Sequence, residues 1–204
     1  PQQALGKQEA IHRSALGGHG GWVTSIALNE ERNLMLSGSF DRTAQLWSLE
    51  SGEKLETFEG HEGAVSGVAF SERGPVTAGH DGTVRLWYYS GLQIDILDDF
   101  KKVLDIEHAE GTSVWSTAAG GVFVRTDEGV SELRSHEGQA TAVAISEQGT
   151  IASGGKNGEV FLYEPEDFAH FQTLNLSGAI WCIVLTDSYL VVGTDDGRIH
   201  RLSR

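Results

Sequence analysis

Short alternating or apolar runs follow one another along the chain, separated by clusters of Gly, Asn, Asp and Ser. Near the N-terminus four such runs read VTSIAL (23–28), LMLSG (34–38), TAQLWSL (43–49) and KLETFEG (54–60). Runs of this length, bounded by turn-forming residues, are typical of β-strands. The pattern therefore predicts four strands in this first stretch and an all-β protein.

The same pattern then recurs. The stretch GHGGWVTSIAL to SGSFDRTAQLW (18–47) matches GHEGAVSGVAF to TAGHDGTVRLW (60–87) position by position, apart from a two-residue loop difference. A looser copy spans 135–163, and a fourth spans 176–202 with Leu176 and Leu202 in place of the histidine and the tryptophan. Self-similarity at such a period indicates a repeat architecture.

Another, degenerate unit fits between the second and third of these copies, with KKVLDIEH, TSVWSTA, GVFVRT and VSELRS as its strands. Aligning VLDI with VSGV puts its missing histidine at Asp99. We expect one domain over 10–204 after an N-terminal tail, 1–9, with five four-stranded units. Their approximate ranges are 19–58, 61–97, 99–134, 136–174 and 176–204.

The last unit has room for only three strands. The segment AIHRSAL (10–16) aligns with KLETFEG as an outermost strand, so we expect it to complete the fifth sheet and close the ring. A ring closed in this way has no free sheet edge at the seam.

Three units also share a set of polar and aromatic residues. An acidic or amide residue precedes an aromatic by six positions, follows a hydroxyl by four, and lies about 20 positions after a histidine. The three sets are His19, Ser37, Asp41 and Trp47; His61, Thr77, Asp81 and Trp87; and His136, Ser153, Asn157 and Tyr163.

These features resemble the WD-repeat β-propellers, which have Gly-His near the start of a unit, an Asp in a later turn and Trp-Asp or a variant closing the third strand. Here the closing residues are LWS (46–48), LWY (86–88) and LYE (162–164). The resemblance implies an all-β propeller of about five four-stranded antiparallel blades. Because rings of this family most often have seven blades, a portion of a larger propeller stays open as an alternative.

The resemblance also implies that each set is a buried hydrogen-bond network in which Asp orients His, His reaches the hydroxyl, and the hydroxyl reaches the indole N–H. Read naively, Ser, His and Asp would form a hydrolase triad. A hydrolase needs one nucleophile with an oxyanion hole rather than three copies, so we expect a structural role and no catalytic residue. A hydrolase stays the less favoured alternative.

Composition narrows the function further. The formal net charge of −14 disfavours nucleic acid, and no apolar run approaches the roughly 20 residues of a membrane helix. Cys182 is the single cysteine, which excludes an internal disulfide and leaves no Cys and His set with metal-ligand spacing. Only Asp105 and Glu107 place carboxylates on the innermost strands, both on one unit, which argues against a glycosidase. We expect an intracellular protein, in cytoplasm or nucleus, with no metal and no cofactor.

Propellers of this family mostly bind proteins on the face that exposes the turn between the second and third strands and the start of the innermost strand. Carried over by position, the residues expected to bind a partner are Trp22, Thr24, Phe40, Ser66, His80, Lys102, Gln139, Lys156, Trp181 and Asp195. In a closed ring Trp181 would lie near Trp22 and Phe40. The expected function is a non-enzymatic scaffold in a multiprotein complex, whose partner is a neutral to basic protein or peptide with an apolar anchor. The alternative is a propeller portion of a longer multidomain protein whose activity lies elsewhere.

Overall fold

The computed structural model describes residues 16–98 and 100–203. Within these residues nineteen strands form five antiparallel sheets, numbered sheet 1 to sheet 5 in chain order.

Sheet 1 contains β1 (Val23–Asn29), β2 (Leu34–Ser39), β3 (Ala44–Ser48) and β4 (Lys54–Phe58). Sheet 2 contains β5 (Val65–Ser71), β6 (Gly74–Gly79), β7 (Val84–Trp87) and β8 (Gln93–Leu97). Sheet 3 contains β9 (Val103–Ala109), β10 (Thr112–Thr117), β11 (Val122–Thr126) and β12 (Gly129–Glu132). Sheet 4 contains β13 (Ala140–Ile145), β14 (Ile151–Gly155), β15 (Glu159–Tyr163) and β16 (His170–Asn175). Sheet 5 contains β17 (Ile180–Leu185), β18 (Tyr189–Thr194) and β19 (Ile199–Ser203).

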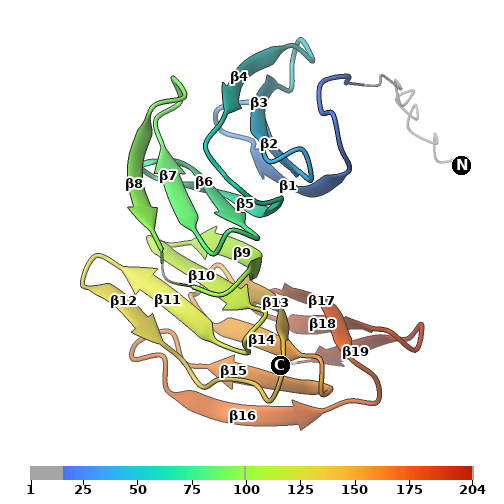
Figure 1. Ribbon diagram of the computed structural model, residues 1–204. Coiled ribbons are helices and arrows are strands. Elements are labelled where there is room, and N and C mark those ends of the chain that lie inside the picture. The colour runs from blue at the N-terminus through green and yellow to red at the C-terminus, as the bar shows by residue number, and fades with distance from the viewer. Residues whose placement is uncertain (1–15, 99, 204) are drawn as a thin grey trace, which may run out of the picture.

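Each sheet is an up-and-down meander in which neighbours in sequence are hydrogen-bonded neighbours in space. The sheets follow one another along an arc, with the first strand of each on the inner side and the last on the outside (Figure 1). The predicted fold class, all-β with five antiparallel sheets in a propeller-like arrangement, is confirmed.

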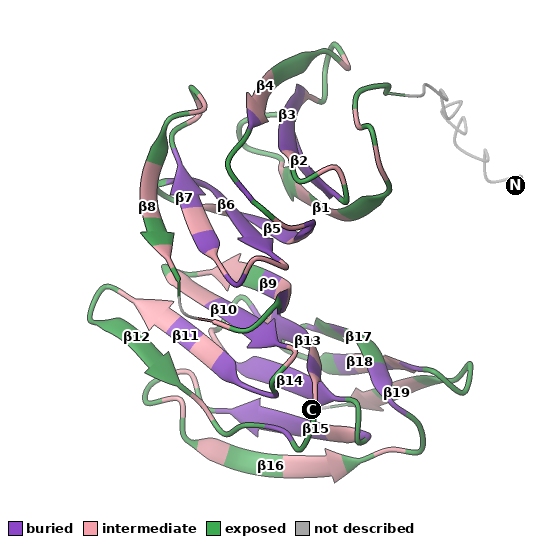
Figure 2. Cartoon of the chain, viewed as in Figure 1, coloured by how far each residue is buried: buried purple, intermediate pink, exposed green. Residues whose placement is uncertain are grey.

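The hydrophobic core lies between successive sheets. Four clusters of buried residues each join one sheet to the next, such as Leu36, Ala44 and Leu46 of sheet 1 with Val65 and Val68 of sheet 2. Burial is concentrated on the middle strands of sheets 1 to 4, while the outer strands β4, β8, β12 and β16 are more exposed (Figure 2). Each sheet is thus stabilised by burying an apolar face against its neighbour.

At the two ends of the arc the corresponding faces are exposed. Ile26 of β1 is 59% exposed, whereas Val68, at the same register position of β5, is 4% exposed. At the other end Val184 of β17 is 59% exposed and Ile199 of β19 is 80% exposed. In the described residues, sheets 1 and 5 therefore do not cover one another as a closed five-sheet ring would require.

The segment 10–15 of the predicted closing strand lies outside the described residues, as does Asp99, the predicted start of the third unit. Ring closure by this strand therefore stays a prediction. Within the part of the chain that the structure describes, no helix is long and apolar enough to cross a membrane.

Candidate functional site

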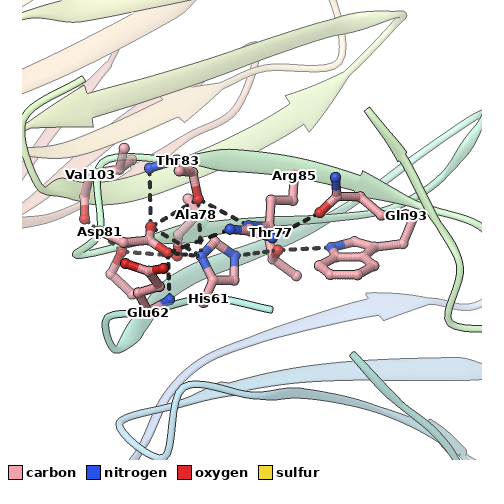
Figure 3. Close-up of polar contacts among 11 residues, drawn as sticks. His61, Glu62, Thr77, Ala78, Asp81, Thr83, Arg85, Gln93 and Val103 are labelled. Atoms are coloured by element: carbon pink, nitrogen blue, oxygen red, sulfur yellow. Dashed lines mark hydrogen bonds and ion pairs between the residues drawn. The ribbon is translucent and has the colours of Figure 1, made fainter. Parts of the chain in front are cut away.

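In sheet 2 the repeated residues form a continuous chain of hydrogen bonds (Figure 3). His61 Nδ1 lies 2.9 Å from Asp81 Oδ2, and His61 Nε2 lies 2.7 Å from Thr77 Oγ1. The Trp87 indole N–H donates to the same hydroxyl oxygen at 2.9 Å. With the His61 ring proton on Nδ1, the Thr77 hydroxyl donates to His61 Nε2 and accepts from Trp87. Every polar side-chain atom in this series of hydrogen bonds therefore has a partner.

Asp81 anchors this network at its outer end. Its carboxylate accepts the Glu62 N–H at 2.8 Å and the Thr83 hydroxyl at 2.9 Å, in addition to His61. Burial acts to raise the pKa of Asp81, but His61 and these hydrogen bonds together lower it. Burial also lowers the pKa of His61, against the attraction of Asp81. A charged Asp81 beside a neutral His61 is the state that these shifts favour at neutral pH.

Sheet 1 repeats the arrangement. His19 contacts Asp41 Oδ2 at 2.9 Å through Nδ1 and Ser37 Oγ at 2.8 Å through Nε2. The Trp47 N–H donates to Ser37 Oγ at 2.8 Å. Although burial opposes the change, hydrogen bonds from Thr43, His19 and the backbone lower the pKa of Asp41.

Sheet 4 departs from the expected network at one link. His136 Nε2 still lies 2.8 Å from Ser153 Oγ, but the Asn157 amide donates to Glu159 Oε2 at 2.5 Å. His136 Nδ1 is buried with no hydrogen-bond partner among the described residues. The expectation that Asn157 orients His136 is therefore wrong. Residue 159 is the reason: sheets 1 and 2 carry a hydroxyl donor at the equivalent position, whereas Glu159 is an acceptor and draws the Asn157 amide away.

The unpartnered ring nitrogen has an electrostatic consequence. Burial lowers the pKa of His136 to about 4; Glu159 opposes this shift and Arg134 adds to it. The aromatic end of the set is also altered, because Tyr163 Oη lies 3.3 Å from Ser153 Oγ and donates to the Arg134 carbonyl at 2.9 Å.

The hydroxyls of these sets are not placed to act as nucleophiles. Ser37 is 4% exposed, while Thr77 and Ser153 are 0% exposed, and each hydroxyl lies between a histidine and an aromatic side chain of its own sheet. A substrate carbonyl would need access to the hydroxyl oxygen, and burial within the sheets prevents this access. The geometry supports the expected structural role.

Most of the positions expected to bind a partner lie where two backbone segments of a sheet are hydrogen-bonded to one another. Every sheet has a backbone hydrogen bond between two of its loops. The donor is an N–H in the turn between the second and third strands, and the acceptor is the carbonyl of the residue directly before the first strand. The pairs are Phe40 with Trp22, His80 with Ala64, Ala118 with Lys102, Lys156 with Gln139 and Asp195 with Ala179. Turn and first strand are thus fixed together on one rim of the arc.

On sheets 1 and 2 this rim carries an aromatic row, defined as Trp22, Phe40 and His80. The Trp22 and Phe40 ring centroids are 5.8 Å apart in an edge-on arrangement, and the Phe40 and His80 centroids are 6.0 Å apart. Trp22 is 81% exposed and Phe40 is 51% exposed. Large aromatic side chains held at the surface in this way are typical anchors of protein interfaces.

Two of the expected binding residues instead connect sheets. The Thr24 hydroxyl donates to the Val65 carbonyl at 2.5 Å, and the Ser66 hydroxyl donates to the Val103 carbonyl at 2.6 Å. Thr141 makes the same bond to the next sheet. Since these hydroxyls already have partners, Thr24 and Ser66 contribute to the stability of the arc.

Several of the predicted residues lie along the concave side of the arc. A cavity of about 560 Å³ opens there, and five of the predicted residues line it. These are Thr24, Ser66, Gln139, Lys156 and Trp181. Trp181 is 64% exposed, but sheets 1 and 5 stand at opposite ends of the arc (Figure 1), so the expected neighbourhood of Trp181 with Trp22 and Phe40 is not found. Lys102 and Asp195 are exposed at the rim, where the Asp195 carboxylate accepts the Ala179 N–H at 2.8 Å.

The sequence analysis missed a second kind of connection between sheets. Ser25 Oγ accepts the Val68 N–H at 3.2 Å, and at the equivalent position Asp105 Oδ2 accepts the Val143 N–H at 3.1 Å. Burial raises the pKa of Asp105 to about 6, against the effect of its backbone hydrogen bonds. Its sequence signal was a carboxylate on an innermost strand, but the acceptor role depends on Val143 of the next sheet, 38 residues away.

Repeated sheets of three or four strands on an arc, each joined to the next by an apolar layer and by side-chain hydrogen bonds to the neighbouring backbone, define a β-propeller architecture. The family described as "WD domain, G-beta repeat" matches residues 11–48 and 52–88. A solved structure of RRP9 WD40 repeats superposes with a TM-score of 0.82 at 20% identity, covering 92% of this chain and 63% of that one. The described residues therefore have the fold of a WD40-repeat β-propeller structure, and residues 11–48 and 52–88 match the WD-repeat family.

Curated relatives are similar over parts of their length. The telomerase protein component 1 of Mus musculus is 36% identical over 76 residues, which is 37% of this chain and 3% of the relative. Autophagy-related protein 16 of Arabidopsis thaliana is 25% identical over 206 residues, covering 91% of this chain and 40% of the relative. The small ribosomal subunit protein RACK1 of Candida albicans is 40% identical over 86 residues, covering 38% and 27%. The chain thus spans less than half the length of each of these relatives.

Proposed function

We propose that this protein is a non-enzymatic scaffold that binds a partner protein or peptide through the aromatic row on sheets 1 and 2. Proteins of the family whose model matches residues 11–48 and 52–88 generally act in protein interaction. The observation that carries the proposal is the pair of exposed, edge-on aromatic rings of Trp22 and Phe40, fixed by the hydrogen bond from the Phe40 N–H to the Trp22 carbonyl. Rigid aromatic anchors lose little conformational entropy on binding.

The negative charge of this protein favours a neutral to basic partner. The net charge of −14 repels acidic chains, and the acidic residues Asp41 and Asp81 directly follow Phe40 and His80 of the row. A neutral to basic segment with an apolar side chain at its centre fits such a surface. An intracellular location is part of the proposal, because relatives are named as a ribosomal subunit protein and a translation initiation factor subunit.

The engaged hydroxyls of Ser37 and Thr77 weigh against the hydrolase alternative. If the chain is a propeller portion of a longer protein, the aromatic row would act as a docking site within that protein's assembly. The proposed binding surface is the aromatic row, whether the propeller is a separate protein or a portion of a longer one.

The test compares proteins captured by wild type and by the double variant Trp22→Ala with Phe40→Ala, identified by quantitative mass spectrometry. The matched control is Tyr88→Ala with Leu92→Ala, which removes two large side chains that are 55% and 68% exposed in the turn between β7 and β8. We expect the row variant to lose specific partners while it keeps the wild-type melting temperature, and the control to retain them. Equal capture by all three proteins would reject the row as the binding surface.

A further inference from the structure

Sheet 3 lacks the aromatic residue that its neighbours carry on the third strand. Trp47 of β3 pairs with Met35, and Tyr163 of β15 pairs with Ile151. The equivalent residue of β11 is Arg125, which pairs with Ser113. The side chain of Arg125 is turned to Asp95 of sheet 2, with 2.8 Å between Nη2 and Oδ2.

The third-strand aromatic normally fills a defined place against the preceding sheet. Trp87 of sheet 2 packs in one cluster with Leu36, Ala44, Leu46 and Phe58 of sheet 1. Tyr163 of sheet 4 packs in the same way with apolar residues of sheet 3. The four sheet 1 residues form an apolar wall against Trp87. By strand register, the corresponding residues of sheet 2 are Val76, Val84, Leu86 and Leu97.

Those four residues line a cavity of about 430 Å³ between sheets 2 and 3, and Arg125 lines its other side. Trp115 of β10 fills part of the space from the second strand, with its indole fully buried and stacked on Phe123. Its Nε1 has no hydrogen-bond partner among the described residues, because Trp115 itself occupies the position that carries Ser37 or Thr77 in sheets 1 and 2. The cavity, called the inter-sheet cavity below, is thus the unfilled place of a missing aromatic ring.

The rim of the inter-sheet cavity is polar and mostly acidic. Glu72, Glu110 and Asp127 line it with Arg73, and Arg125 is already paired. His108 lies between Ser113 Oγ at 2.8 Å and Glu72 Oε2 at 2.9 Å. Partial burial acts to raise the pKa of Glu72, but hydrogen bonds from its own N–H, from His108 and from the Gly111 N–H lower it. Glu72 therefore carries its charge at neutral pH.

From the vacant ring position and the acidic rim, we propose that the inter-sheet cavity binds an aromatic side chain of a partner peptide, flanked in that peptide by basic residues. The apolar wall on sheet 2 receives the ring, and the three rim carboxylates attract the flanking cations. This site is separate from the aromatic row, so a partner could engage either or both.

The probe is the peptide Ac-Lys-Trp-Lys-NH2, titrated to millimolar concentration while methyl NMR signals of Val76, Val84, Leu86 and Leu97 are followed. Ac-Lys-Ala-Lys-NH2 tests the ring, and Ac-Glu-Trp-Glu-NH2 tests the charge. We expect saturable shifts of these methyl groups with the first peptide and an affinity at least about tenfold lower for the other two. Absent shifts, or equal affinity for all three peptides, would overturn the proposal.

Two variants fill the cavity from opposite sides. Arg125→Phe supplies the missing ring from sheet 3 without an N–H that needs a partner, and Leu97→Phe copies Phe58 of sheet 1 from the outer strand of sheet 2. Either variant that folds should abolish the methyl shifts, whereas Trp22→Ala with Phe40→Ala should leave them unchanged. Undiminished binding by a folded, filled variant would contradict the assignment, and loss in the row variant alone would move the binding to the aromatic row.

Discussion

Sheets 2 and 3 have the same strand order but contain different interiors. In sheet 2 a histidine, a hydroxyl and an indole are joined from the turn to the third strand, and Trp87 fills the space against sheet 1. In sheet 3 the hydroxyl position holds Trp115 and the aromatic position holds Arg125. The first arrangement gives a satisfied core, and the second leaves an unpartnered indole N–H and a cavity. The repeat is therefore tolerant of losing its polar network, provided that apolar packing between sheets remains.

The largest expected effect comes from breaking the complete network. Thr77→Val removes the hydroxyl that joins His61 Nε2 to Trp87 Nε1 and leaves both buried groups without their partner. We expect a loss of about 3 kcal/mol in the free energy of unfolding, measured by urea denaturation. The control is Thr57→Val on the half-buried outer strand of sheet 1, which should change stability by less than about 0.5 kcal/mol. Similar values for both variants would refute the role of the network.

A smaller effect, of opposite sign, is expected from repairing sheet 3. Arg125→Phe places an aromatic ring against Val76, Val84 and Leu86, at the cost of a partly exposed ion pair with Asp95. Because exposed ion pairs contribute little and ring burial contributes more, the net gain in unfolding free energy should be about 1 kcal/mol. Thermal and urea unfolding measure this gain. A destabilised Arg125→Phe protein would show that the cavity cannot accept the ring.

Sheet 4 offers a comparable gain through its polar residues. The double variant Asn157→Asp with Glu159→Thr recreates the carboxylate and hydroxyl of sheet 2 opposite His136. We expect about 1 kcal/mol of added stability at pH 7 and a His136 pKa above its value of about 4, followed by NMR of the ring protons. In wild type, the depressed pKa makes stability fall as pH decreases from about 6.5 towards 4, since the unfolded histidine binds a proton first.

The single variant Asn157→Asp serves as the control for this repair. It places a second carboxylate beside Glu159, so it should gain less stability than the double variant. If the single variant gained as much, Glu159 would not be the reason that His136 lacks a partner.

A pH-dependent effect is expected at the connection between sheets 3 and 4. The pKa of Asp105 is raised to about 6 in the folded protein from an ordinary value near 3.8. A raised pKa contributes stability below the unfolded value that is lost as pH rises through the folded value. Asp105→Asn keeps an acceptor for the Val143 N–H and removes the titration. The difference in unfolding free energy between the two proteins should therefore shift in favour of the variant between pH 4 and 6. It should continue to shift towards pH 7, because burial and the Asp105 charge raise the pKa of Glu107 to about 7.

The strands and the five sheets could be predicted because alternating residues, turn residues and the repeat all agree. The polar set could be predicted wherever its members recur at fixed spacing, as His61, Thr77, Asp81 and Trp87 do. The broken link in sheet 4 could not, because it depends on Glu159, two positions beyond the motif. The inter-sheet roles of Thr24 and Ser66 depend on carbonyls 37 to 41 residues away, which spacing within one unit does not reveal.

The inter-sheet cavity could not be predicted from the sequence, for a related reason. The third unit was recognised by its strands, whereas the identity of Arg125 as the aromatic position follows from its pairing with Ser113. An absent ring leaves no local signal in the sequence. It becomes a cavity only when sheet 2 supplies the opposite wall.

Hydrogen exchange of the third strands tests most directly whether the polar network makes a sheet rigid. Both β7 of sheet 2 and β11 of sheet 3 lie between two hydrogen-bonded strands, so their strand pairing is alike while only sheet 2 contains the network. We predict that β7 amides exchange more slowly than β11 amides, and that Thr77→Val accelerates exchange in β7 to the level of β11. Equal protection of the two strands in wild type, or an unchanged β7 in Thr77→Val, would contradict the account.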